Sequence, residues 1–198
     1  YPLMFFLLIE TIIQVTLPEL HVTWLCVTLL SVLYFIYCSE MWNQLDALTG
    51  LLNQNSYLNR TAEMRRRGGV LVVFDVDDFK QINDRYGHLQ GDICLAEIGR
   101  CIKKVYARSG YCYRTGGDEF CVLMENADRE AQCAQEFVRQ LEQRRKAVDF
   151  LPTVSFGSAP FLGEDVLAVK NRADQEMYRY KKARKPDAAH CSPNHTLL

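Results

Sequence analysis

A stretch of twelve residues at positions 113–124, YRTGGDEFCVLM, constrains the fold more than any other part of this 198-residue chain. Apolar and aromatic residues flank two consecutive glycines, which is typical of a β-hairpin because glycine accepts the positive φ angles of tight turns. Asp118 and Glu119 follow the turn directly. Adjacent acids between apolar strands are unusual, so the hairpin is predicted to carry a functional site at its mouth.

A second acidic segment follows a short apolar strand. Residues 68–78 read GGVLVVFDVDD, and a continuous apolar run entered through glycines predicts a buried strand. Side chains alternate along a strand, so Asp75 and Asp77 are expected to point to the same face. Asp78 falls where a helix would begin, and we interpret it as a helix cap. Asp75 ends the buried run, where a carboxylate needs a partner or a metal ion.

The two acidic segments are expected to meet. If the hairpin lies beside the strand, Asp75, Asp118 and Glu119 converge, and converging carboxylates repel one another unless a divalent cation lies between them. Oxygen ligands suit Mg²⁺, with Mn²⁺ as the alternative ion, and Mg²⁺ also takes substrate phosphates. The acids therefore predict a metal site that receives a phosphorylated substrate.

Three lysines extend the predicted site. Lys80 follows the acids on the next turn, and Lys181 and Lys185 share one face of the last helix because they are spaced i, i+4. Lysines on a terminal helix are usually solvent-exposed, but beside an acidic metal site they would neutralise phosphate groups. Carboxylates, Mg²⁺ and lysines together predict phosphoryl transfer, in which positioning and electrostatics supply most of the catalysis.

Two interpretations of Gly116 and Gly117 stay open at this point. Glycine supplies positive φ in tight hairpins. Its missing side chain also lets a bulky substrate lie against the backbone. The two roles are compatible with each other, and the sequence does not separate them.

The pattern after residue 70 predicts one α+β domain. The order is strand, helix, helix, hairpin, helix, strand, helix, with no internal repeat. That order favours a layered sandwich over a βαβ repeat. The catalytic domain is expected at residues 46–188 and a flexible tail at 189–198. Residues 39–45 contain neither Gly nor Pro and are expected to form a helical linker. Residues 39–67 favour helix with a break at Thr49-Gly50, and Leu45, Leu48, Leu51 and Leu52 have helical apolar spacing.

The first 38 residues are expected to be a membrane segment, formed by the last two helices of a longer sensor region. Residues 21–38 contain no Asp, Glu, Lys or Arg and approach the about 17–25 apolar residues of a membrane helix. A buried core helix is the alternative, whereas a signal peptide is disfavoured because a basic region and a small-residue cleavage site are missing. The predicted location is the inner (cytoplasmic) membrane, with the catalytic domain in the cytoplasm.

Charge and cysteine usage exclude some classes of protein. The net charge of −1 gives no field that would attract nucleic acid, so no nucleic-acid partner is expected. The eight cysteines include no CxxC pair, which predicts a reducing compartment without a disulfide framework.

Five ordered blocks resemble the GGDEF domains of diguanylate cyclases. They are DALTGLLN at 46–53, the acidic segment at 74–92, GGDEF at 116–120, SFGSA at 155–159 and ADQEMYRYKK at 173–182. A five-letter match alone would be weak, but five blocks in the family's order are a specific signal. The resemblance implies a fold of the adenylyl-cyclase and polymerase-palm type. It also implies condensation of two GTP into cyclic di-GMP and two pyrophosphates at a homodimer interface.

By position, the resemblance implies a role for each site residue. Mg²⁺ would be held by Asp75, the backbone carbonyl of Val76 and Asp118. The catalytic residues would be Asp118 and Glu119, one of which helps to deprotonate the attacking 3′-hydroxyl, together with Lys80. The substrate-binding residues would be Asn83 and Asp92 at the guanine edge, Lys181 and Lys185 at the phosphates, Gly116 and Gly117 at the loop, Phe79 in the core or pocket wall, and His88 as a structural hydrogen-bonding residue.

One departure from the family bears on regulation. Many members carry an R-x-x-D motif shortly before the signature and bind product there as an inhibitor, whereas this chain has ARSG at 107–110.

Two functions other than a diguanylate cyclase are considered. A catalytically weak domain that binds GTP or relays signals is disfavoured because both signature acids are present. A cyclase for another base is disfavoured by Asp92, since a carboxylate can accept from N1–H and N2–H₂ of guanine together.

Overall fold

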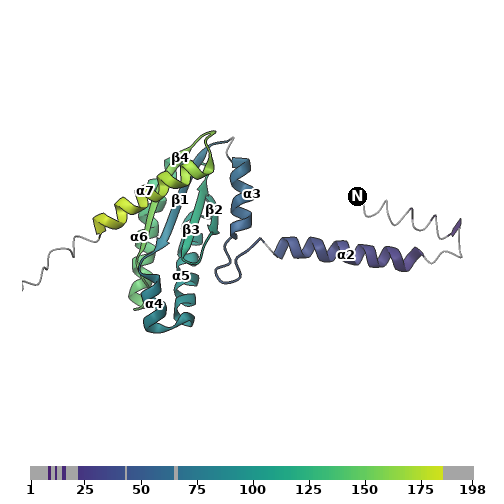
Figure 1. The fold of residues 1–198 in the computed structure, drawn as a ribbon, viewed down its shortest axis with the longest axis horizontal. Helices are drawn as coiled ribbons and strands as arrows, with labels where there is room; N and C mark the ends of the chain where they lie inside the picture. The colour runs from purple at the N-terminus through teal and green to yellow at the C-terminus, as the bar shows by residue number, and fades with distance from the viewer. Residues whose placement is uncertain are drawn as a thin grey trace, which may run out of the picture. The chain divides into compact units, whose positions relative to one another are not determined.

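The N-terminal part of the chain contains one long apolar helix. The computed structural model describes residues 9, 12, 15–16, 22–42, 44–64 and 67–184, and it divides into two units, Tyr1–Gln44 and Leu45–Leu198. Helix α2 (Val22–Trp42), purple in Figure 1, lies in the first unit. Many of its described apolar side chains are exposed, whereas Cys26 is buried; the exposed ones are Leu25, Val27, Leu29, Val32, Leu33, Tyr34, Phe35, Ile36 and Tyr37.

The predicted membrane segment is not supported by these residues. Within the part of the chain that the structure describes, no helix combines the length and the apolar character needed to cross a membrane. This finding covers the span expected at residues 21–38. The span expected before it falls almost entirely outside the described residues.

A four-stranded antiparallel sheet forms the centre of the second unit. Its strand order is β2-β3-β1-β4. Strand β1 (Gly69–Val76) lies between β3 (Glu119–Met124) and β4 (Val154–Phe161), and β2 (Gly110–Arg114) completes the predicted hairpin with β3. The order of elements predicted from residue 70 onward is confirmed. An antiparallel sheet flanked by helices is the predicted α+β class.

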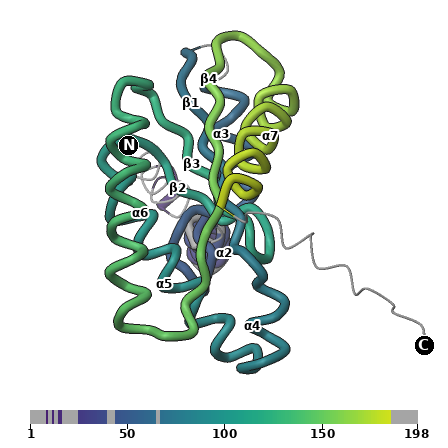
Figure 2. Tube along the Cα trace, turned by 90° about the vertical axis from the view of Figure 1, so that its left-hand side faces the viewer, coloured from purple at the N-terminus to yellow at the C-terminus, as the bar shows by residue number. Residues whose placement is uncertain are grey.

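Helices cover both faces of this sheet, as Figures 1 and 2 show. They are α3 (Gln54–Met64), α4 (Phe79–Tyr86), α5 (His88–Tyr106), the 3₁₀ turn η1 (Ala127–Arg129), α6 (Glu130–Ala147) and α7 (Val166–Arg184). Val72 and Phe74 of β1 belong to a core with α5 and α6, whereas Leu71 and Val73 belong to a second core with α3 and α7. The continuous apolar run in β1 fills two cores because neighbouring side chains face opposite sides.

Helix α7 approaches the sheet most closely at a glycine. A Cβ atom built on Gly157 of β4 would lie 2.2 Å from the backbone nitrogen of Met177 and 2.3 Å from the carbonyl oxygen of Ala173. Only a residue without a side chain permits this approach of helix backbone to strand. The SFGSA segment therefore fixes the position of α7 against β4.

A wide turn occupies residues 46–50, where the sequence predicted helical spacing interrupted by a break at Thr49-Gly50. The Asp46 side chain accepts hydrogen bonds from the backbone nitrogen of Thr49 at 2.9 Å and from its hydroxyl at 2.7 Å. Such local bonds compete with helix formation, and Gly50 has a φ of 64°. Leu45 pairs with Leu52, and Leu52 pairs in turn with Tyr113 of β2. The linker helix ends at Trp42, so it does not continue through Leu45 as predicted.

Candidate active site

The acidic residues gather where β1 ends and the antiparallel strand β3 begins. β1 and β3 are neighbours, and their register places Asp75 directly opposite Glu119. Side chains in such a pair have Cβ atoms about 4.5–5.5 Å apart. Asp118 lies one residue earlier, in the turn, and its carbonyl oxygen accepts a hydrogen bond from the backbone nitrogen of Val76 at 3.3 Å. The strand register thus makes Glu119, rather than Asp118, the cross-strand neighbour of Asp75.

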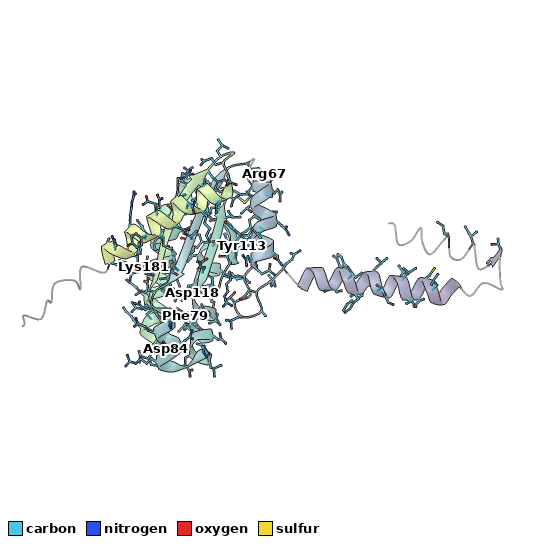
Figure 3. All side chains as sticks on the ribbon, in the orientation of Figure 1. Arg67, Phe79, Asp84, Tyr113, Asp118 and Lys181 are labelled. Carbon is cyan, nitrogen blue, oxygen red and sulfur yellow. The ribbon has the colours of Figure 1, made fainter. Side chains whose placement is uncertain are left out.

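Lys181 brings a positive charge to this end of the sheet. Its Nζ lies 2.5 Å from Oδ2 of Asp75 and 3.2 Å from Oδ1 of Asp77. Burial disfavours the ammonium charge, but the hydrogen bond and charge of Asp75, followed by those of Asp77, outweigh it and raise the pKa of Lys181. Figure 3 shows Lys181, Asp118 and Phe79 toward the same end of the sheet, away from Arg67.

Three further residues join the site that were not among the predicted site residues, although Asp77 was expected to share a face with Asp75. Asp77 is buried and bound to Lys181. Lys170 of α7 lies 3.5 Å from Glu119. Burial, opposed by Lys170 and reinforced by Glu119, raises the pKa of Asp174. Spacing could have suggested the two α7 residues, because Lys170, Asp174 and Lys181 follow one another at intervals of four and seven residues.

The donor set fits a divalent cation that completes its shell on a substrate. Among the described residues, no group of three or more His, Cys, Asp or Glu side chains is arranged to hold a metal ion. Mg²⁺ is usually bound through one or two carboxylates together with substrate phosphates. Asp75 and Glu119 supply two carboxylates in register. The ammonium group of Lys181 on Asp75 stands in for the cation charge that this position attracts.

The residues predicted to bind guanine lie on α4 and α5. Asn83 is half-buried, and its Oδ1 has no hydrogen-bond partner within the described part of the chain. A Cβ atom on Gly91 would lie 2.0 Å from that oxygen. A buried acceptor without a partner is costly, so this oxygen is suited to receive a ligand's donor. Lys80, His88 and Asp92 are exposed, and Phe79 is half-buried.

The glycine loop does not use the backbone freedom that its sequence suggested. The described glycines with positive φ do not include Gly116 or Gly117, so the turn-chemistry interpretation is wrong. A Cβ atom on Gly117 would meet nothing within 4 Å. The carbonyl oxygen of Gly117 accepts from the Arg114 guanidinium at 2.8 Å, and Arg114 also binds Asp46 at 3.1 Å. The loop is therefore anchored by Arg114 and leaves open space at Gly117, whereas a Cβ atom on Gly116 would lie 3.2 Å from Cβ of Glu119. The close approach of a substrate to this loop stays a prediction.

Asp78 differs from its prediction. It precedes α4, but its side chain makes no capping hydrogen bond. Its φ of 55° makes it the non-glycine residue with positive φ in the described part of the chain. Such a conformation costs about 1–3 kcal/mol and is concentrated at functional sites. The backbone of the turn between β1 and α4 is thus strained at Asp78, just after Asp75 and Asp77.

The remaining predicted site residue, Lys185, lies outside the described residues.

The fold and site define an α+β domain with carboxylates and lysines at one end of an antiparallel sheet. The family described as diguanylate cyclase, GGDEF domain, matches residues 43–186. The chain belongs to this family.

Curated relatives agree with this assignment. The diguanylate cyclase DgcP of Pseudomonas aeruginosa is 38% identical over 156 residues, covering 70% of this chain and 22% of DgcP. The probable diguanylate cyclase DgcJ of Escherichia coli K12 is 34% identical over 122 residues, covering 57% of this chain and 24% of DgcJ. The chain thus spans only about a quarter of the length of these two relatives.

Solved structures show the same fold. The GGDEF domain of DgcB from Caulobacter crescentus, in complex with c-di-GMP, is similar with a TM-score of 0.61 and 29% identity, covering 71% of this chain and 91% of that domain. The diguanylate cyclase SiaD of Pseudomonas aeruginosa, in complex with its activator SiaC, has a TM-score of 0.65 and 26% identity, covering 89% of this chain and 74% of SiaD.

Proposed function

We propose that this chain is a diguanylate cyclase, which condenses two GTP into cyclic di-GMP and two pyrophosphates in a Mg²⁺-dependent reaction. One observation carries the proposal: Asp75 and Glu119 lie opposite each other at a strand end, and Asp75 already binds a cationic group, Lys181. This is the charge arrangement that a metal–triphosphate substrate requires. The similarity to DgcP and to a GGDEF domain bound to c-di-GMP supports it.

The acids are proposed to hold the cation and to accept a proton. Asp75, the backbone carbonyl of Val76 and Asp118 are the proposed ligands of Mg²⁺ or Mn²⁺, and Glu119 is close enough by register to join them. When bound, the ion neutralises charge on the phosphates. Asp118 or Glu119 takes the proton of the attacking 3′-hydroxyl, and Glu119 can reach outward because its side chain is 51% exposed.

The remaining residues are proposed to bind GTP. Asn83 and Asp92 accept hydrogen bonds from the guanine edge, and the unpartnered Oδ1 of Asn83 supports that role. Lys80, Lys181 and Lys185 neutralise the phosphates. Phe79 borders the guanine pocket, and a substrate passes close to the backbone at Gly117, where a side chain would find open space.

Two chains are proposed to act together. One site of this kind holds one GTP, whereas the product joins two nucleotides in a ring. Two sites must therefore face each other, which a two-fold homodimer provides. The specific activity of the chain should rise with enzyme concentration. A flat profile in a sample shown to be monomeric contradicts the dimer.

The decisive experiment supplies GTP, ATP or a mixture together with Mg²⁺ and identifies the products by mass spectrometry. We expect cyclic di-GMP from GTP, and loss of turnover in Asp75→Asn and Asp118→Asn with the thermal unfolding temperature preserved. Asp149→Asn is the matched control, because Asp149 is exposed and removed in sequence from the site segments. Full Mg²⁺-dependent activity in Asp118→Asn contradicts the assignment, and binding of GTP without product favours the signal-relay alternative.

Location is a separate proposal. We propose attachment of the N-terminal segment to the cytoplasmic face of the inner membrane, because a helix that is apolar on all sides needs cover. The exposed apolar side chains of α2 support attachment, whereas no described helix meets the requirements for a span. Fractionation of cells that express the chain tests this proposal. We expect the chain in the membrane fraction, and its recovery in the soluble fraction after mild washing contradicts attachment.

A further inference from the structure

Asp77 is held more tightly than any carboxylate around it. Its Oδ2 accepts from the Thr153 hydroxyl at 2.7 Å, and its Oδ1 accepts from the Ser155 hydroxyl at 2.8 Å. Its backbone nitrogen donates to the Thr153 carbonyl oxygen at 2.9 Å. The side chain is only 8% exposed. Both oxygens of Asp77 are therefore already bound to β4 and the residues just before it, and Asp77 is poorly placed to ligate a metal ion.

Asp75 is held far more loosely than Asp77. Its side chain is 25% exposed. Within the described part of the chain, the hydrogen bond to its carboxylate comes from Lys181. Lys181 thus bridges two carboxylates of different character, one fixed in the sheet and one open to a ligand. Lys181 occupies Oδ2 of Asp75 and repels a cation that approaches this carboxylate, so a cation that uses both oxygens of Asp75 displaces Lys181 from it but not from Asp77.

We propose that Asp77 is a positioning residue for Lys181. Before a cation binds, Lys181 neutralises Asp75 and competes with the cation for it. When a cation takes Asp75, Lys181 stays anchored on Asp77 and its ammonium group turns to the phosphates of the nucleotide. The last step rests on the proposed function, since it requires a nucleotide triphosphate in the site.

The backbone geometry limits this movement to the lysine side chain. Helix α7 is fixed against β4 at Gly157, where its backbone leaves no room for a Cβ atom. Lys181 lies one turn beyond this contact, and its side chain is 31% exposed. Its four-carbon stem can therefore change partner without a shift of the helix.

The alternative is that the ion pair between Asp77 and Lys181 only holds α7 against the sheet. Such a structural ion pair contributes to stability, but it does not couple Asp77 to cation binding through Lys181. Mn²⁺ binding to the nucleotide-free chain, followed by electron paramagnetic resonance, distinguishes the two cases without any catalytic readout. The variants are Lys181→Met, Asp77→Asn and the double variant. Lys182→Met is the control, since it removes the same charge from an exposed neighbour on α7.

We expect Lys181→Met to bind Mn²⁺ roughly two- to fivefold more tightly than the parent chain, the range given by losing one partly exposed ion pair. Asp77→Asn should bind Mn²⁺ more weakly by a similar factor, because Lys181 then has Asp75 as its one carboxylate partner. The double variant should match Lys181→Met, since Asp77 acts through Lys181. Lys182→Met should match the parent chain.

Three outcomes overturn the inference. The first is equal Mn²⁺ affinity in the parent chain and Lys181→Met. The second is an Asp77→Asn effect that persists undiminished when Lys181 is already Met, because Asp77 would then act through its charge alone. The third is a change in Mn²⁺ affinity in Lys182→Met as large as that in Lys181→Met. Any positive charge on this part of α7 would then repel the cation, without a specific contact to Asp75. Thermal unfolding of each variant checks that the fold is retained, and Lys181→Met remains informative if Asp77→Asn does not fold.

A second measurement separates this inference from the proposed function. Binding of GTP with Ca²⁺ in place of Mg²⁺, followed by calorimetry, should weaken in both Lys181→Met and Asp77→Asn. If the parent chain makes no cyclic di-GMP but the order of Mn²⁺ affinities holds, the proposed function fails and the positioning role of Asp77 stands. Unchanged GTP affinity in Asp77→Asn contradicts the claim that Asp77 holds Lys181 in place for the phosphates of the nucleotide.

Discussion

The substitution Gly91→Ala tests how the guanine-binding residues are placed. The added Cβ atom would lie 2.0 Å from Oδ1 of Asn83 and 3.3 Å from Cζ of Phe79. Ordinary carbon contacts lie at about 3.5–4.0 Å. Asn83 must therefore rotate away, since Gly91 is fixed within α5. Asn83 is half-buried and has room to turn outward.

Two opposing effects set the change in stability. Alanine in a helix interior is favoured over glycine by about 0.5–1 kcal/mol, whereas overpacking costs about 1–3 kcal/mol. The rotation of Asn83 relieves most of the clash, so we expect the thermal unfolding temperature to change by less than about 4 °C, which is roughly 1 kcal/mol for a chain of this size. The effect on GTP binding should be larger. An unmade hydrogen bond to a buried group costs about 1–3 kcal/mol, or about five- to 150-fold in affinity.

The assay is calorimetric binding of GTP with Ca²⁺, combined with thermal unfolding. The control is Gly91→Ala in a chain that already carries Asn83→Ala, where the added methyl group meets no carboxamide. There we expect no further loss of affinity. Undiminished GTP binding in Gly91→Ala, or a loss of the same size with and without Asn83, refutes the argument that Gly91 acts by leaving space for Asn83.

Three further predictions concern the scaffold and regulation. Gly157→Ala should destabilise the chain by about 1–3 kcal/mol in urea unfolding, because the added methyl group meets the backbone of Met177 at 2.2 Å. Burial alone would raise the pKa of Asp46, but hydrogen bonds from its turn and from Arg114 hold that pKa below its usual value. Asp46 therefore stabilises the fold above its unfolded pKa of about 4, and the parent chain should lose more stability than Asp46→Asn as the pH falls from 5 to 3. Residues 107–110 lack the R-x-x-D motif, so initial rates at saturating GTP should be insensitive to added cyclic di-GMP, and half-inhibition at low micromolar product would contradict this.

The sequence predicts the sheet better than it predicts the site. Continuous apolar runs identify β1 and the hairpin, and the acids at their ends lie where the strands leave the core. Register is a different matter, because no local signal states which residue of β3 faces Asp75. The pairing with Glu119 follows from the whole ladder. The break at Thr49-Gly50 was predicted, but the turn already begins at Asp46, because Asp46 binds Thr49 locally and leucine spacing does not reveal that bond.

Long-range pairs were missed for another physical reason. Asp77 and Lys181 are more than one hundred residues apart in the chain, and their contact depends on the close approach of α7 to β4 at Gly157. Alternation did predict that Asp75 and Asp77 share a face. It could not predict that hydroxyl groups of Thr153 and Ser155 would occupy Asp77 and leave Asp75 open. The difference between Asp75, which is open to a ligand, and Asp77, which is already hydrogen-bonded, therefore arises only in the assembled fold.

The same packing explains why the charged groups collect at one end of the sheet. β1 must supply apolar side chains to both cores, so its interior has no place for charge, and Asp75 is the half-buried residue that follows the buried run Val70–Phe74. On the face that carries Asp75 and Asp77, stability then comes from hydrogen bonds and ion pairs, while Val76 still packs into the core on the opposite face. These polar contacts, with the exception of the buried Asp77, involve partly exposed groups that contribute little to folding. Substitutions at Asp75, Glu119 or Lys181 should therefore change ligand binding well before they change the fold.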